Sequence, residues 1–314
     1  MPRGGDIFTG AGVASGAVTR PTWSTATATA TAGTISPDSS TRTGRIIVNA
    51  GDFGLTAGVC RAIVELSREG IVSNTSAMMC SEGSIRNAAA HFSSLAVPCG
   101  VHLQLTDGRP ASREMAAYLE RRTRSAWFPD SPDRAGMPIG LVRIEWDEQV
   151  QCFLRHFGRP SHLDSHQWVH LMPDYLDVYC ETAARYDVPV RGLDACAHDL
   201  IAARGVRATR HVVNLKVCLG AGPDGRSLLA DAVRHAGNGG GAAAVLEILT
   251  HPGYHDGELQ RLSPLAERRE IELAFLREER IADLLGELGL AIVDYPSVGR
   301  AGDCDSELTR VKPG

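Results

Sequence analysis

Apolar and polar residues alternate in two different periods along most of this chain. Short apolar runs of four to seven residues, typical of buried strands, recur from residue 45 to residue 295 and are separated by stretches with helical spacing. Eight such runs predict strands: 45–50, 74–80, 99–105, 161–166, 189–194, 212–217, 245–250 and 290–295.

Helical spacing is clearest in three of the intervening stretches. Residues 56–67, 146–156 and 264–288 carry apolar side chains three or four positions apart, as expected of helices that bury one face. Strands that alternate with helices predict parallel βα units. Eight units suit an α/β fold of the TIM-barrel-like (β/α) type, and an incomplete or irregular barrel would also satisfy the pattern.

The two ends of the chain differ in composition from its middle. Residues 1–44 contain the run WSTATATATATAGT, whose small side chains bury too little apolar surface to offset the entropy of ordering. We therefore predict a disordered N-terminal extension over 1–44, a single (β/α) barrel domain over 45–300 and a flexible tail over 301–314. The long segment 107–145 is rich in Arg, Pro and Gly, which is typical of a lid or substrate loop.

Composition excludes several classes of function. The 314 residues carry a formal charge of −5 without a basic block and only 5% aromatic residues, which argues against nucleic-acid and membrane-surface binding. No run reaches the ~20 apolar residues of a membrane helix. The eight cysteines are scattered without a CxxC pair, as in a reduced cytoplasmic protein.

The segment HLDSHQWVH, residues 162–170, concentrates groups that can bind metal or transfer protons. In an extended conformation His162, Asp164 and His166 share one face. Three such groups on one face are costly to bury without a function. The alternative is a polar strand end with satisfied histidines.

Further candidates follow or end other predicted strands. Asp52, His102, His166 and His251 all fall at the carboxyl ends, where parallel α/β folds gather their chemistry. One carboxylate and two imidazoles suit a divalent metal with open positions for water and substrate. The alternatives are a helix N-cap for Asp52, a core histidine for His102 and a turn residue for His251.

The segments IIVNAGDFGLTAGV, GIVSNTSAMM, GVHLQLTDGRP, FGRPSHLDSHQWVHLMP and EILTHPGY resemble the YdjC family of carbohydrate deacetylases, over residues 46–254. The resemblance implies a TIM-barrel-like fold, often dimeric. It also implies a metal, Mg²⁺ or Zn²⁺, held by Asp52, His102 and His166. Members of this family remove an N-acetyl group from an amino sugar and release acetate.

One position departs from the family pattern. The family's first segment reads NADDFG, and its first Asp is the expected general base; here that position is Gly51. A positioned general base is worth ~10²–10⁴ in rate. Asp164, His251 or a substrate group would have to replace it, unless the site has turned to other chemistry or to binding alone.

The leading hypothesis is a metal-dependent hydrolase that cleaves an N-acyl group from an amino sugar. Asp164 orients a histidine or moves protons, His251 is the candidate acid, and Arg191 pairs with a substrate anion or with Asp164. His170 is expected to orient a metal-binding residue without contacting the metal itself. The alternatives are epimerase- or lyase-like chemistry on the same metal site and a catalytically silent sugar-binding relative. We expect a cytoplasmic homodimer, the dimer on the resemblance alone.

Overall fold

Seven parallel strands form the centre of the computed structural model, which describes residues 44–131, 136–172, 174–222, 224–238, 244–263 and 265–299. The strand order is β4-β3-β2-β1-β6-β5, and β7 pairs with the beginning of β1. The predicted N-terminal extension, apart from Gly44, and the predicted tail lie outside the described residues. The strands are β1 Gly44–Phe53, β2 Asn74–Met78, β3 Cys99–Leu103, β4 Leu163–Ser165, β5 His211–Asn214, β6 Val245–Thr250 and β7 Leu290–Ile292.

The sheet curls into a barrel that is closed irregularly. The predicted strand 189–194 forms no ladder; only Val190 pairs, with Leu163 of β4 on one side and with Ala208 on the other. Backbone hydrogen bonds from Arg191 to Leu163 and from Thr209 to Val190 complete this closure. The predicted TIM-barrel-like fold is therefore confirmed in its irregular form, with a single bridging residue where one strand was expected.

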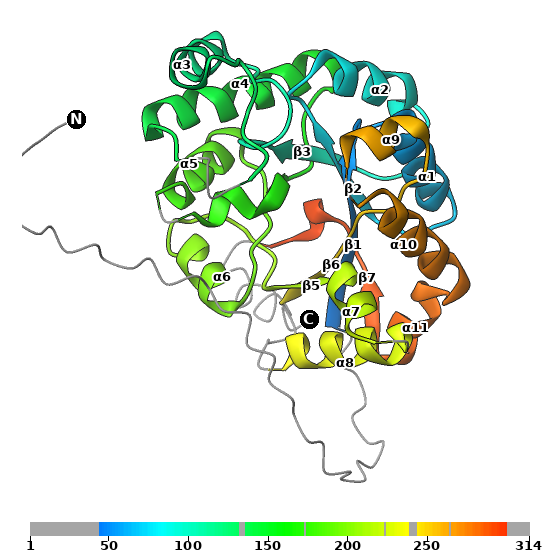
Figure 1. The fold of residues 1–314 in the computed structure, drawn as a ribbon. Coiled ribbons are helices and arrows are strands. Elements are labelled where there is room, and N and C mark those ends of the chain that lie inside the picture. Colours follow the sequence, from blue (N-terminus) through cyan, green and yellow to red (C-terminus); the bar gives the residue numbers. More distant parts are fainter. Residues whose placement is uncertain are drawn as a thin grey trace, which may run out of the picture. The chain divides into compact units, whose positions relative to one another are not determined.

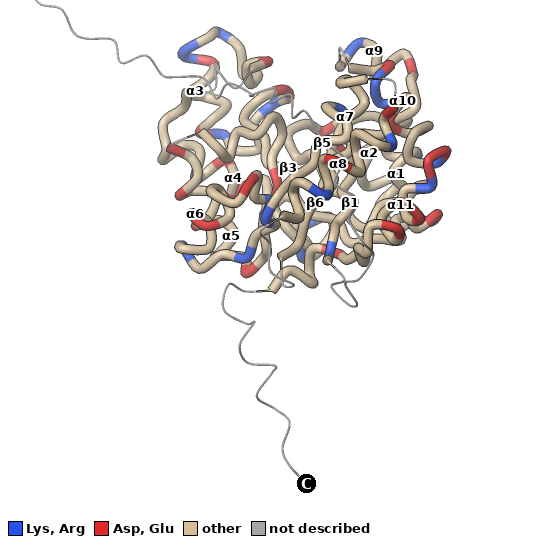
Figure 2. The backbone as a smooth tube through the Cα atoms, turned by 90° about the horizontal axis from the view of Figure 1, so that it is seen from below, with Lys and Arg blue, Asp and Glu red and all other residues tan. Residues whose placement is uncertain are grey.

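Helices surround the strands (Figure 1). None of the described helices is both long and apolar enough to span a membrane. Acidic and basic positions are interspersed along them (Figure 2). They are α1 Ala57–Arg68, α2 Glu82–Phe92, α3 Arg113–Thr123, α4 Ile139–Phe157, α5 Leu176–Tyr186, α6 Ala195–Ala202, α7 Leu215–Ala221, α8 Gly225–Gly237, α9 Gly257–Leu262, α10 Ala266–Glu278 and α11 Ile281–Glu287, with short 3₁₀ turns at His166–Leu171 (η2) and Tyr295–Ser297 (η3).

Two predicted elements are divided by local signals. The predicted strand 212–217 stops at Asn214, because the Asn214 side chain accepts a hydrogen bond from Lys216 N and so begins α7. The predicted helix 264–288 is two helices, α10 and α11, separated at Arg280, whose φ of 47° is left-handed. A left-handed residue cannot continue an α-helix.

The long segment 107–145 folds back onto the barrel through one buried carboxylate. Glu145 of α4 is fully buried and accepts hydrogen bonds from the backbone N–H groups of Ala111 and Ser112, both at 2.8 Å. Gln149, one turn further along α4, donates to the same carboxylate. The carboxylate thereby ties the start of α3 to the helix that covers it.

Replacement of Glu145 by Gln should destabilise the fold. The amide keeps the shape of the side chain but turns a donor toward a buried backbone N–H, which costs about 1–3 kcal/mol in the free energy of unfolding. Glu148→Gln, on the same helix, is the matched control, because Glu148 is partly exposed and, among the described residues, forms its ion pair with Arg155. Urea unfolding of both variants measures the difference, and equal losses would contradict this role for Glu145.

Candidate active site

The carboxyl end of β1 places Asp52 in an unusual backbone conformation. Its φ is 66°, in the left-handed region, and its side chain is 1% exposed. The N-cap of α1 is Thr56, whose hydroxyl accepts from Val59 N, so Asp52 is not the helix cap. A strained, buried carboxylate that does not cap a helix is typical of a functional site.

The two predicted histidine ligands converge on this carboxylate. His102 Nε2 lies 3.1 Å and His166 Nδ1 3.2 Å from Asp52 Oδ1. One potential ligand atom from each of the three residues lies within 4.8 Å of the others. The strands β1 and β3 and the turn after β4 thus bring together Asp52, His102 and His166.

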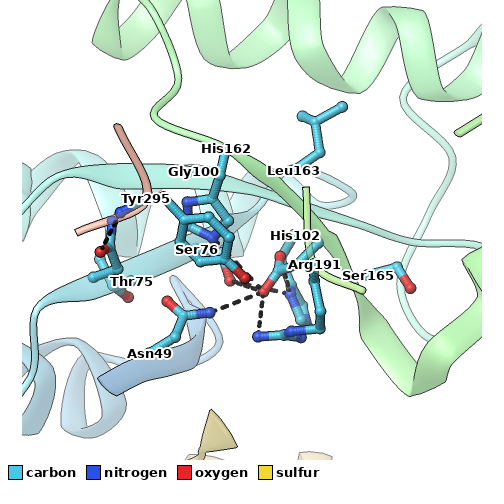
Figure 3. A network of polar contacts seen from close by, with 12 residues as sticks. Asn49, Thr75, Ser76, Gly100, His102, His162, Leu163, Ser165, Arg191 and Tyr295 are labelled. Carbon is cyan, nitrogen blue, oxygen red and sulfur yellow. Dashed lines mark hydrogen bonds and ion pairs between the residues drawn. The ribbon is translucent and has the colours of Figure 1, made fainter. Parts of the chain in front are cut away.

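Asp164 lies behind His102 and is fully buried. Its Oδ1 is 2.7 Å from His102 Nδ1, while its Oδ2 accepts from Ser76 at 2.8 Å and from Asn49 at 3.2 Å and pairs with Arg191 at 2.8 Å. Asn49, Ser76, His102 and Arg191 point toward one another around this position (Figure 3). Burial alone would raise the pKa of Asp164, but the charges of Arg191 and His102 hold it far below its usual range.

This contact decides which nitrogen of His102 is free. Asp164 is ionised, so it accepts the proton on His102 Nδ1. Burial opposes a charge on His102, but Asp164 and Asp52 raise its pKa, so Nε2 offers its lone pair once the ring gives up its second proton. Nε2 is buried and, despite its distance of 3.1 Å to Asp52, makes no hydrogen bond of proper geometry. A buried nitrogen with a free lone pair beside a carboxylate fits a metal ligand.

Arg191 is held by two carboxylates. Its guanidinium contacts Asp164 at 2.8 Å and Glu247 of β6 at 2.6 Å, and its side chain is 1% exposed. The pairing with Asp164 was one of the two roles predicted for Arg191. Its substrate-binding role stays a prediction.

The second oxygen of Asp52 has its own partner. Arg269 of α10 donates to Asp52 Oδ2 at 2.5 Å. Burial would raise the pKa of Asp52, but the charges of Arg269 and His166 keep it well below the usual value. Burial works against the charge of His166 as well, yet Asp52 and Asp107 raise its pKa to about 9. The carboxylates therefore attract positive charge to this position.

His251 covers the backbone of Gly51. A Cβ atom at Gly51 would lie 3.2 Å from His251 Cδ2 and 3.3 Å from His251 Nε2. Burial lowers the pKa of His251 to about 3, so the ring is uncharged at neutral pH. Its backbone N–H donates to Glu272, whose own pKa burial raises to about 7.

The other two histidines of the 162–170 segment lie away from the three convergent side chains. His162 stacks on Tyr295 at 3.7 Å between ring centroids, and His170 Nδ1 lies 2.5 Å from Ser165 Oγ. Both are fully buried, and burial lowers the pKa of each to about 3. The supporting role predicted for His170 stays a prediction.

The convergent side chains open into a cavity of about 710 Å³, within the range of small-molecule sites. Three side chains that line this cavity were not predicted from the sequence: Arg269, Glu272 and Asp107. The Asp107 carboxylate lies 3.1 Å from His166 Nε2. Arg269 and Glu272 lie three positions apart on the buried face of α10, next to Leu273. Two charged residues in an apolar stripe were the signal that could have found them.

Comparisons with known proteins show which family the chain resembles. The chain is 30% identical to a carbohydrate deacetylase of Vibrio cholerae, over 81% of this chain and 96% of that protein. It is 29% identical to a chitooligosaccharide deacetylase of Proteus mirabilis, over 80% and 97%. A crystal structure of a putative cellobiose-phosphate cleavage protein from Enterococcus faecalis is similar at a TM-score of 0.70 and 26% identity, over 82% of this chain and 99% of that one. The family described as YdjC-like protein matches residues 45–287, and the chain belongs to this family.

Proposed function

We propose that this protein is a metal-dependent hydrolase that removes an N-acetyl group from an amino sugar and releases acetate. The observation that carries the proposal is the convergence of Asp52, His102 and His166 at the carboxyl ends of the barrel strands, inside the large cavity. The names of the relatives, carbohydrate and chitooligosaccharide deacetylases, support an enzyme that acts on an amide bond.

Asp52, His102 and His166 are the residues that would hold a divalent ion, Mg²⁺ or Zn²⁺. When bound, such an ion polarises the acyl oxygen and makes a water molecule more acidic. Asp164 fixes the tautomer of His102. The Asp107 carboxylate contacts Nε2 of His166, the nitrogen that does not face Asp52. These contacts hold both rings in place.

Proton transfer is the step that Gly51 affects. The Asp164 oxygens are already engaged by His102, Ser76 and Arg191, which leaves Asp164 an orienting role. His251 lies over Gly51, where the family has a carboxylate. We propose that the neutral His251 imidazole accepts the proton from the attacking water and passes it to the leaving amine. An imidazole whose pKa is about 3 and which is displaced from the usual base position is a weak base, so we expect slow turnover. A sugar-binding relative without activity is the second candidate.

The predicted homodimer, cytoplasmic location and domain boundaries remain predictions. Sedimentation of the purified chain tests the first of them.

Removal of one ligand should abolish metal binding. His166→Ala is expected to lower metal affinity by more than about 100-fold and to reduce acetate release from N,N′-diacetylchitobiose to background. His91→Ala is the matched control, because the one hydrogen bond of the His91 ring to a described residue is to Asn87 of its own helix. Elemental analysis after dialysis measures the metal content, and full metal content in His166→Ala would contradict the assignment.

Restoration of the missing carboxylate should raise activity. Gly51→Asp is expected to increase acetate release by about 10²-fold or more, because it supplies a general base beside the water position. The backbone accepts a side chain here, although the His251 ring must shift by a few tenths of an ångström.

Gly51→Asn is the control for this variant, since it has the same size and no basic oxygen. An equal gain in both variants would attribute the effect to packing. No gain in either, with metal bound, would favour the sugar-binding alternative.

A further inference from the structure

Trp168 follows the metal-site histidine His166 in a backbone conformation that is unfavourable for a large side chain. Gln167 has φ and ψ of 51° and 28°, and Trp168 has 60° and 24°. Both are left-handed, a strained backbone conformation for a non-glycine residue. A tryptophan in this region needs an explanation.

The neighbours of Trp168 hold this conformation on both sides. On one side, the Gln167 amide donates to Asp107 Oδ2 at 2.9 Å, the same oxygen that lies 3.1 Å from His166 Nε2. On the other side, Val169 and His170 are fully buried. The turn therefore presents the indole from a fixed position next to the proposed metal ligands.

The indole lines the cavity of the candidate site. Among the described residues around this cavity it is the only Trp, Tyr or Phe. Its N–H donates to no other described residue and, unlike that of Trp146, is not buried. The guanidinium of Arg191 lies 5.6 Å from the ring centroid, and Arg191 is itself fixed by Asp164 and Glu247. The indole thus presents a flat apolar ring beside a fixed guanidinium and an N–H donor that has no partner among the described residues.

Four of the seven described non-glycine residues with positive φ line this one cavity: Asp52, Asp107, Gln167 and Trp168. For the first three the structure shows a polar contact at the site. For Trp168 the structure shows an indole that lines the cavity beside Arg191, so the contacts that hold this turn also leave the ring available to a ligand.

We propose that Trp168 is the sugar-binding residue of the site: the apolar C–H face of a pyranose ring stacks on the indole, and the free N–H donates to a sugar hydroxyl or acyl oxygen. This inference rests on the proposed function and deepens it. An indole combines an apolar face with a polar edge, which matches the two kinds of surface of a pyranose. It also loses little conformational entropy on binding. Trp168 thereby sets which ring faces the metal ligands.

The test is a fluorescence titration with N,N′-diacetylchitobiose. Trp127 provides the matched control, because its ring also lies beside a guanidinium, that of Arg109 at 5.8 Å, but it does not line this cavity. We expect a saturable change in tryptophan emission in the wild type and in Trp127→Phe. The same titration of Trp168→Phe should lose the change, while calorimetry shows that most of the affinity is kept.

Trp168→Ala should bind about tenfold more weakly than Trp127→Ala, the loss typical of an aromatic contact. Near-ultraviolet circular dichroism checks that each variant is folded, and Trp168→Phe carries the test if Trp168→Ala does not fold. Equal affinities of the two alanine variants, or an unchanged signal in Trp168→Phe, overturn the inference while leaving the deacetylase proposal intact. Wild-type protein that neither binds the disaccharide nor releases acetate from it overturns both.

Discussion

The buried carboxylate of Asp164 is the interaction on which the rest of the site depends. It joins β4 to β1 through Asn49, to β2 through Ser76 and to β3 through His102, and Arg191 balances its charge. An ionised group in the interior is tolerated only when it is paired and hydrogen-bonded on all sides. Loss of one partner from such a network costs roughly 3–5 kcal/mol. The same contacts that make the charge tolerable therefore fix the relative positions of four strands.

This dependence links the irregular closure of the barrel to its chemistry. Arg191 lies next to Val190, the single residue that bridges β4 and the segment before β5. Its guanidinium reaches inward to Asp164 and to Glu247 of β6, so two buried ion pairs hold the gap where a regular barrel would have a ladder. Tyr295 donates to Glu247 at 2.5 Å and completes the partners of the second carboxylate. Because side chains close the barrel here, fewer backbone hydrogen bonds join β4 to the segment before β5. The buried ion pairs of Arg191 compensate for these missing hydrogen bonds.

The sequence predicts most of the strands and the polar groups at their carboxyl ends because both follow from local rules, while the choice of three metal ligands among those groups came from the family resemblance. Apolar runs mark buried strands, and parallel strands bring Asp52, His102 and His166 to one end of the barrel whatever the details of packing. Arg269 could not be assigned in this way, because its contact with Asp52 joins residues 217 positions apart. The left-handed backbone of Trp168 is equally invisible, since it is imposed by tertiary contacts against the preference of the residue. Local patterns therefore determine which groups reach the site, and long-range contacts determine their charge and orientation.

The pairing of Asp52 with Arg269 bears directly on the glycine at position 51, where the resemblance leads us to expect a second Asp. A site with two adjacent carboxylates and two histidines carries one more negative charge than this one. In such a site a bound cation and Arg269 would together neutralise more negative charge. Here Asp52 alone faces Arg269 and His166, both of which lower its pKa. A bound cation therefore competes with an existing positive partner for one carboxylate, which predicts weaker metal retention than in a site with both acids. A substrate contact that does not depend on the ion would offset this loss, and Trp168, which lines the same cavity, is the residue that we propose for it.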